Sequence, residues 1–138
     1  MNKLENAKIL SSALIGVEFE FYSNKSIKQT AKELGDILSK KIRVEEKAHS
    51  DFVVTDKVFK IEPDMSGGEK LMELVTGALP YISARLMVIR VSQWISEHGY
   101  TNDRSSMHLN ISFDDNKGGK YRIEKMNVLK FISDFKEE

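Results

Sequence analysis

The chain has 138 residues, of which 41% are apolar and 30% are charged, a balance typical of one globular domain with a moderate core. Its 21 Lys and Arg residues match 21 Asp and Glu residues, so electrostatics gives no reason to expect a nucleic acid as partner. The chain has no cysteine, which excludes disulfides and thiolate metal sites.

The first predicted elements are a strand and a helix. In residues 14–22, aromatic and β-branched side chains alternate with Glu18 and Glu20, which is the pattern of a half-buried strand. Ser26 and Gln29 have the spacing of a capping box, and apolar residues recur behind them every three or four positions. The sequence therefore predicts a strand over 14–22 and a helix over 26–40.

The middle of the chain is predicted to form short strands. The candidates are residues 42–44, 52–55, 57–62 and 70–76. Residues 55–57 suit a tight turn between the second and third of them, without the glycine that would make a strong hairpin signal. Proline and paired glycines then mark a loop over 63–68.

The last third of the chain is predicted to form helix, strand, turn and helix. Gly77–Pro80 opens the longest helix, Gly99 suits its C-cap, and a wide apolar stripe that includes Ile82 and Leu86 predicts a well-buried helix. A strand over 106–113, a turn over 114–119 and a helix over about 122–136 follow.

Sorting the strand residues by parity predicts a sheet with two different faces, because successive side chains point to opposite sides. One face is apolar and suits helix packing: Val17, Phe19, Phe21, Phe59, Ile61, Met72, Leu74, Met107, Leu109, Ile111 and Phe113. The other face is polar: Glu18, Glu20, Tyr22, Lys60, Glu62, Glu73, Ser106, His108 and Asn110, with Asp64 and Ser66 in the next loop. We therefore expect an α+β domain, an antiparallel, curved sheet with helices packed on one face.

The polar face admits two interpretations. An antiparallel sheet often has one solvated face, and polar residues are expected there. However, Glu18, Glu20 and Glu73 crowd one partly apolar surface, where carboxylates repel one another unless a cation lies between them. Carboxylates are ligands of Mg²⁺, and the imidazole of His108 suits a metal or a phosphate contact. The second interpretation predicts a site for a divalent metal and a phosphorylated ligand.

Four segments of the chain, taken in order, resemble the amidoligase family. They are GVEFEF (16–21), FKIEPDMS (59–66), MELVTGALPY (72–81) and SSMHLNISF (105–113). That family belongs to the carboxylate–amine ligase superfamily, which includes glutamine synthetase and glutamate–cysteine ligase. The resemblance implies a glutamine-synthetase-like catalytic core and ATP-dependent formation of an amide bond. In such enzymes ATP phosphorylates a carboxylate and an amine then displaces the phosphate, so the resemblance implies small-molecule or peptide carboxylate and amine substrates.

The resemblance also implies roles for individual residues. Glu18, Glu20 and Glu73 match metal-binding acids, here for Mg²⁺. Asp64 and Ser66 match the loop that borders the substrate.

The remaining assignments concern the nucleotide. By the same resemblance, His108 matches a histidine near metal and nucleotide. Asn110 stands where the family often has a second histidine. Lys60 lies on the same predicted face, and we infer that it meets a phosphate or a carboxylate.

The length of the chain leaves a second function open. Family members continue beyond the third helix, so we interpret residues 1–138 as a single domain, the N-terminal part of an amidoligase-like catalytic domain. The alternative is a non-catalytic structural or assembly module that reuses the ligase fold, as a homo-oligomer or in a larger assembly. No apolar run approaches the roughly 20 residues that span a bilayer, so no membrane partner is expected and the predicted location is cytoplasmic.

Overall fold

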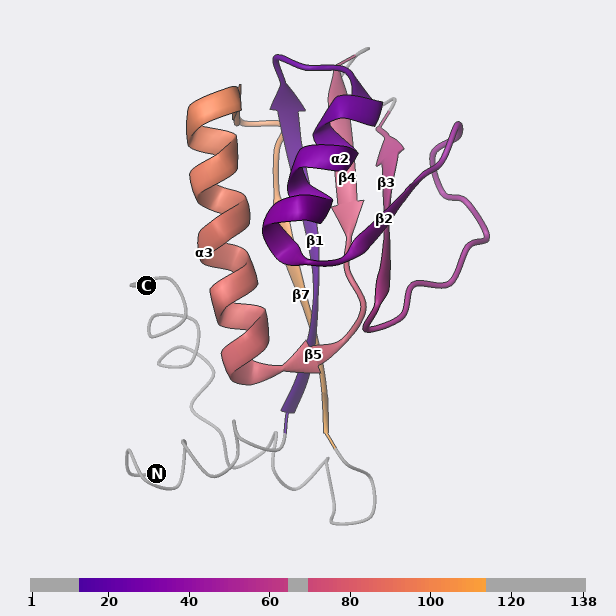
Figure 1. The fold of residues 1–138 in the computed structure, drawn as a ribbon, viewed down its shortest axis with the longest axis vertical. Coiled ribbons are helices and arrows are strands. Elements are labelled where there is room, and N and C mark those ends of the chain that lie inside the picture. The colour runs from indigo at the N-terminus through magenta and orange to yellow at the C-terminus, as the bar shows by residue number, and fades with distance from the viewer. Residues whose placement is uncertain (1–12, 65–69, 114–138) are drawn as a thin grey trace.

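The computed structural model describes residues 13–64 and 70–113. These residues form one seven-stranded sheet and two helices that pack on one of its faces (Figure 1). The elements in chain order are β1 (Ala13–Ser23), α2 (Ile27–Leu38), β2 (Lys41–Val44), β3 (Val58–Pro63), β4 (Leu71–Val75), β5 (Leu79–Pro80), α3 (Tyr81–His98), β6 (Gly99–Tyr100) and β7 (Met107–Phe113). The predicted α+β class is confirmed, whereas the turn predicted at 114–119 and the helix predicted at 122–136 lie outside the described residues.

The first strand, β1, is the centre of the sheet. β4 and β5 pair with one of its edges, and β7 and β6 pair with the other. Figure 1 shows β4 and β7 on opposite sides of β1. Glu18 consequently has a partner on each side, Val75 in β4 and His108 in β7. This arrangement brings residues from three distant parts of the sequence onto one surface.

The prediction of an antiparallel sheet is wrong at one edge, where β2 runs parallel to β3. Lys41 pairs with Val58 and Val44 pairs with Ile61. Parallel neighbours need a crossover of about a dozen residues or more to return the chain to the same end. The segment 45–57 makes this crossover, so the sheet is mixed.

The strand predicted at 52–55 is also wrong, because these residues belong to the crossover. The predicted turn does form: the Thr55 N–H donates to the Val58 carbonyl at 2.9 Å. The Thr55 hydroxyl accepts from the N–H groups of Lys57 and Val58 at 3.2 and 3.0 Å. The turn therefore leads directly into β3 instead of joining two strands of a hairpin.

The helices begin and end close to the predicted positions. The Ser26 hydroxyl caps α2 by accepting from the Gln29 N–H at 3.2 Å, as the capping pattern predicts, and Ser39 ends the helix in a left-handed conformation (φ 53°). Gly99 ends α3, where a side chain would meet the Tyr22 carbonyl oxygen at 2.2 Å. The expectation of a well-buried α3 is wrong, because Ile82 is 77% exposed.

The core lies between the apolar face of the sheet and one side of each helix. The sheet contributes Ile15, Val17, Phe19, Phe21, Phe59, Ile61, Met72 and Leu74, and the helices contribute Ala31, Leu34, Leu38, Ala84, Met87, Val91 and Trp94. The predicted apolar face is therefore confirmed over β1, β3 and β4. On β7 it is only partly covered by described residues, since Met107 is 39% exposed and Leu109 and Ile111 are partly buried.

Candidate metal centre on the polar face

Strand register aligns the polar residues in two rows across the sheet. In the first row, Glu20 of β1 lies opposite Glu73 of β4, which lies opposite Glu62 of β3. In the second row, His108 of β7 lies opposite Glu18, and Lys60 follows beyond Val75. Three carboxylates are thus cross-strand neighbours, an arrangement that is unfavourable without a compensating charge.

Asp64 joins two members of the first row to form what we call the acidic centre, composed of Glu20, Asp64 and Glu73. One carboxylate oxygen from each residue lies within 4.8 Å of the other two. All three residues are half-buried, which limits competition by water while leaving the oxygens accessible. Their backbones are held firmly, because the Asp64 N–H donates to the Leu71 carbonyl at 2.9 Å and the other two residues lie within paired strands.

The ionisation of Glu73 reflects this crowding. Burial, and after it the nearby charges of Glu18, Glu62, Glu20 and Asp64, together raise the pKa of its carboxyl from 4.5 to about 7. The ionised form of Glu73 is therefore disfavoured unless a positive charge approaches. Oxygen-only donors with this total charge suit a hard divalent cation such as Mg²⁺ or Ca²⁺.

Polar side chains of β7 and of Ser106, the residue before it, hydrogen-bond to the two acids of β1. The Ser106 hydroxyl donates to the Glu20 carboxylate at 2.8 Å, and the Asn110 amide donates to the Glu18 carboxylate at 3.1 Å. The His108 Nδ1 atom lies 3.8 Å from a Glu18 oxygen, and its Nε2 atom lies 3.5 Å from the Ser106 hydroxyl. This border of the acidic centre is open, because the His108 side chain is 61% exposed.

The opposite border is formed by Lys60, Glu62 and the crossover segment 45–57. The Lys60 ammonium donates to the Ser50 carbonyl at 3.0 Å and lies 3.3 Å from the Glu62 carboxylate. Glu62 in turn accepts from the backbone N–H groups of His49 and Ser50 at 3.1 and 3.2 Å. These contacts fix the segment over the edge of the polar face. A phosphate contact by Lys60 stays a prediction, and it would have to replace them.

The predicted site residues thus fall into three groups. Glu20, Asp64 and Glu73 come together in the acidic centre. Glu18, His108 and Asn110 lie beside it, and Lys60 is turned toward the segment 45–57. Ser66 lies outside the described residues.

Two residues that make contacts at the site were not among the predicted site residues: Ser106, through its hydroxyl, and Glu62, through its carboxylate. Parity alone predicted that both lie on the polar face. Their partners could be identified only from the register of β7 against β1 and from the path of segment 45–57.

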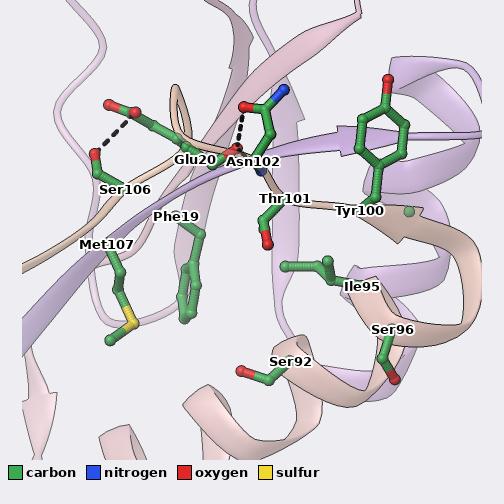
Figure 2. Close-up of a pocket in the computed structure, with 12 residues that line it drawn as sticks. Phe19, Glu20, Ser92, Ile95, Ser96, Tyr100, Thr101, Asn102, Ser106 and Met107 are labelled. Atoms are coloured by element: carbon green, nitrogen blue, oxygen red, sulfur yellow. Dashed lines mark hydrogen bonds between the residues drawn. The ribbon is translucent and has the colours of Figure 1, made fainter.

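A cavity of about 440 Å³ lies next to the acidic centre, where the pairing of β7 with β1 ends and that of β6 begins. Figure 2 shows Phe19, Ile95 and Met107 on its apolar side and the Glu20 carboxylate at a corner, bonded to Ser106. Among the described residues, no lysine or arginine lines this cavity. The cavity is therefore unsuited to a phosphate. It shares Glu20 with the acidic centre, whereas Asp64 and Glu73 do not line it.

Comparisons of the chain with protein-family models, with curated proteins and with solved structures found no match. Within residues 13–64 and 70–113, no helix is long and apolar enough to cross a membrane.

Proposed function

We propose that the acidic centre binds a divalent cation, and that the domain is an ATP- and Mg²⁺-dependent carboxylate–amine ligase or its metal- and nucleotide-binding portion. The observation that carries the proposal is the approach of three carboxylates from β1, β4 and the end of β3 to within 4.8 Å. The resemblance of four segments to the amidoligases supports the wider assignment. A cytoplasmic location, where ATP is abundant, is part of the same proposal.

The residues present fit a hard cation. Glu20, Asp64 and Glu73 would hold it through carboxylate oxygens, and the ion would supply positive charge to the phosphates of a bound nucleotide. His108 and Asn110 lie along the open border, where they can donate to a nucleotide that bridges from the acidic centre toward β7. A small-molecule or peptide carboxylate would then be activated and attacked by an amine.

Calorimetric titration of the full chain with Mg²⁺ and a non-hydrolysable ATP analogue tests this proposal. Glu20→Gln, Asp64→Asn and Glu73→Gln each remove one carboxylate with little change of shape. Each variant is expected to weaken Mg²⁺-dependent nucleotide binding by about tenfold or more, because charge-assisted contacts are worth about 1.5 kcal/mol or more each. Alanine at Glu18, Glu20 or Glu73 is expected to abolish it.

The matched control is Glu97→Gln, which removes the same charge from a side chain that is 70% exposed on α3. This variant is expected to bind as the unaltered protein does. Equal binding by all four variants would contradict the proposal. No Mg²⁺-dependent binding by the unaltered chain would favour the alternative of a non-catalytic assembly module.

A further inference from the structure

Within the part of the chain that the structure describes, no strand lies against the outer edge of β7, the edge that faces away from β1. Glu20 and Ser106 form a hydrogen-bonded pair, since the Glu20 N–H donates to the Ser106 carbonyl at 2.9 Å. The backbone N–H and C=O groups of successive residues point to opposite edges of a strand. The backbone groups of residues 108, 110 and 112 therefore also point toward β1. Those of Met107, Leu109 and Ile111 point away from it, to the outer edge. Among the described residues, β7 pairs with β1 alone (Figure 1).

The features that normally prevent an edge from pairing are missing from this strand. Its sequence, MHLNISF, contains no lysine, acidic residue or proline. Its register against β1 runs without a bulge from Phe113 to Met107. A straight and uncharged edge of this kind is a template for another strand.

We propose that this edge pairs with β7 of a second copy of the chain, antiparallel and about a two-fold axis at Asn110. In this register Leu109 lies opposite the Ile111 of the other copy, and the two exchange backbone hydrogen bonds. Asn110 lies opposite its own counterpart in a non-hydrogen-bonded pair. In this register the outward-facing N–H and C=O groups of residues 109 and 111 are all hydrogen-bonded.

The side chains of β7 are complementary to themselves in this register. On the helix-covered face, Leu109 meets Ile111, and both are only partly buried within one copy. On the polar face, His108 lies opposite Ser112, so no two like charges meet. Burial of the half-exposed apolar residues therefore adds to the hydrogen bonds.

A dimer built on one strand pair buries less surface than a standard stable interface, so its population is expected to rise with protein concentration. Sedimentation velocity of the full chain should show a reversible change from the mass of one chain to twice that mass. Ile111→Lys places a lysine on the edge, as natural edge strands often do. The variant is expected to remain monomeric, with unchanged circular dichroism.

Disulfide trapping tests the register directly, because the chain has no cysteine of its own. Residues in a non-hydrogen-bonded antiparallel pair have Cα atoms about 4.5 Å apart, within the range that a disulfide requires. Asn110→Cys should therefore form a covalent dimer under mild oxidation. Ser112→Cys is the matched control on the same strand and face, and its counterpart lies several residues away across the two-fold axis.

The expected result is about tenfold more covalent dimer for Asn110→Cys than for Ser112→Cys. Equal trapping of the two variants would overturn the register and with it the proposal. A chain that stays monomeric at all concentrations would also overturn it, and slow hydrogen exchange at residues 107, 109 and 111 in that monomer would show that another segment of the same chain covers the edge. These outcomes are independent of Mg²⁺ and nucleotide binding.

Discussion

Glu73 couples the acidic centre to pH. Burial and the neighbouring carboxylates raise the pKa of its carboxyl to about 7, so the folded chain holds a proton that the unfolded chain releases near pH 4.5. The stabilisation from this proton is fully present below pH 4.5 and is lost as the pH rises through 7. Above pH 7, the ionised carboxylate therefore opposes folding unless a cation is bound.

Glu73→Gln removes this ionisation. Without divalent ions, we expect it to raise the free energy of unfolding by ~1–2 kcal/mol at pH 8, a value reduced for solvent screening of a half-exposed group, and to change it little at pH 4. Urea denaturation at the two pH values measures the difference. Glu97→Gln should show no such dependence, and an equal effect of Glu73→Gln at both pH values would contradict the electrostatic explanation.

Gly77 allows the crossover segment to approach β4. A Cβ atom at this position would lie 2.0 Å from the Thr55 carbonyl oxygen and 2.8 Å from the Asp56 nitrogen, and neither backbone atom can move without displacing the segment. Gly77→Ala is therefore expected to lower the free energy of unfolding by about 2 kcal/mol or more. At Gly16 in β1 the nearest atom would lie 3.6 Å away, so Gly16→Ala should cost less than about 0.5 kcal/mol. Similar losses for the two variants, measured by urea denaturation, would contradict this explanation.

At the scale of elements, the segment 45–57 depends on Glu62. Its carboxylate accepts two backbone N–H groups and balances the Lys60 ammonium, and the residue is 3% exposed. Glu62→Ala leaves these groups without their acceptor, which is expected to cost about 3 kcal/mol and to speed proteolysis within the segment. Glu46→Ala, an exposed change in the same segment, should leave both the stability and the proteolysis rate unchanged.

The elements were predictable to different degrees for physical reasons. β1 and α2 were predicted to within a few residues, because their signals are local: the alternation of apolar and polar residues in β1 and the Ser26 cap of α2. Residues 52–55 are as β-branched and apolar as a strand, yet they serve as the crossover that makes β2 parallel to β3. Side chains alternate between the two faces in parallel and in antiparallel strands alike. The alternation that identified the faces therefore could not show that β2 runs parallel to β3.

At the scale of the whole molecule, the sequence could predict which face of the sheet carries the site residues. Alternation assigns Glu18, Glu20 and Glu73 to the polar side, but it does not reveal which acids become neighbours. The registers of β1, β4 and β3 decide that Glu20 and Glu73 meet and that Asp64 joins them. The proposed roles of His108, Asn110 and Lys60 in nucleotide binding stay predictions.

Cation binding at the acidic centre should stabilise the entire fold, because the ligands come from β1, from β4 and from the residue after β3, and they separate on unfolding. At a Mg²⁺ concentration ten times the dissociation constant, the expected gain is about 1.4 kcal/mol. The gain should be larger at pH 8 than at pH 6, since a proton on Glu73 competes with the ion. A thermal shift that is independent of pH, or retained in Asp64→Asn, would contradict this linkage.

The central position of β1 has a consequence for synthesis on the ribosome. This strand emerges before every strand that pairs with it, and Glu18 must await His108, which follows 90 residues later in the chain. Synthesis adds about 5–20 residues per second, so the edge of β1 that pairs with β7 stays unpaired for several seconds or more. Long-range pairing of this kind also slows folding. The nascent chain is therefore most vulnerable to aggregation at the strand that becomes the best protected in the finished sheet.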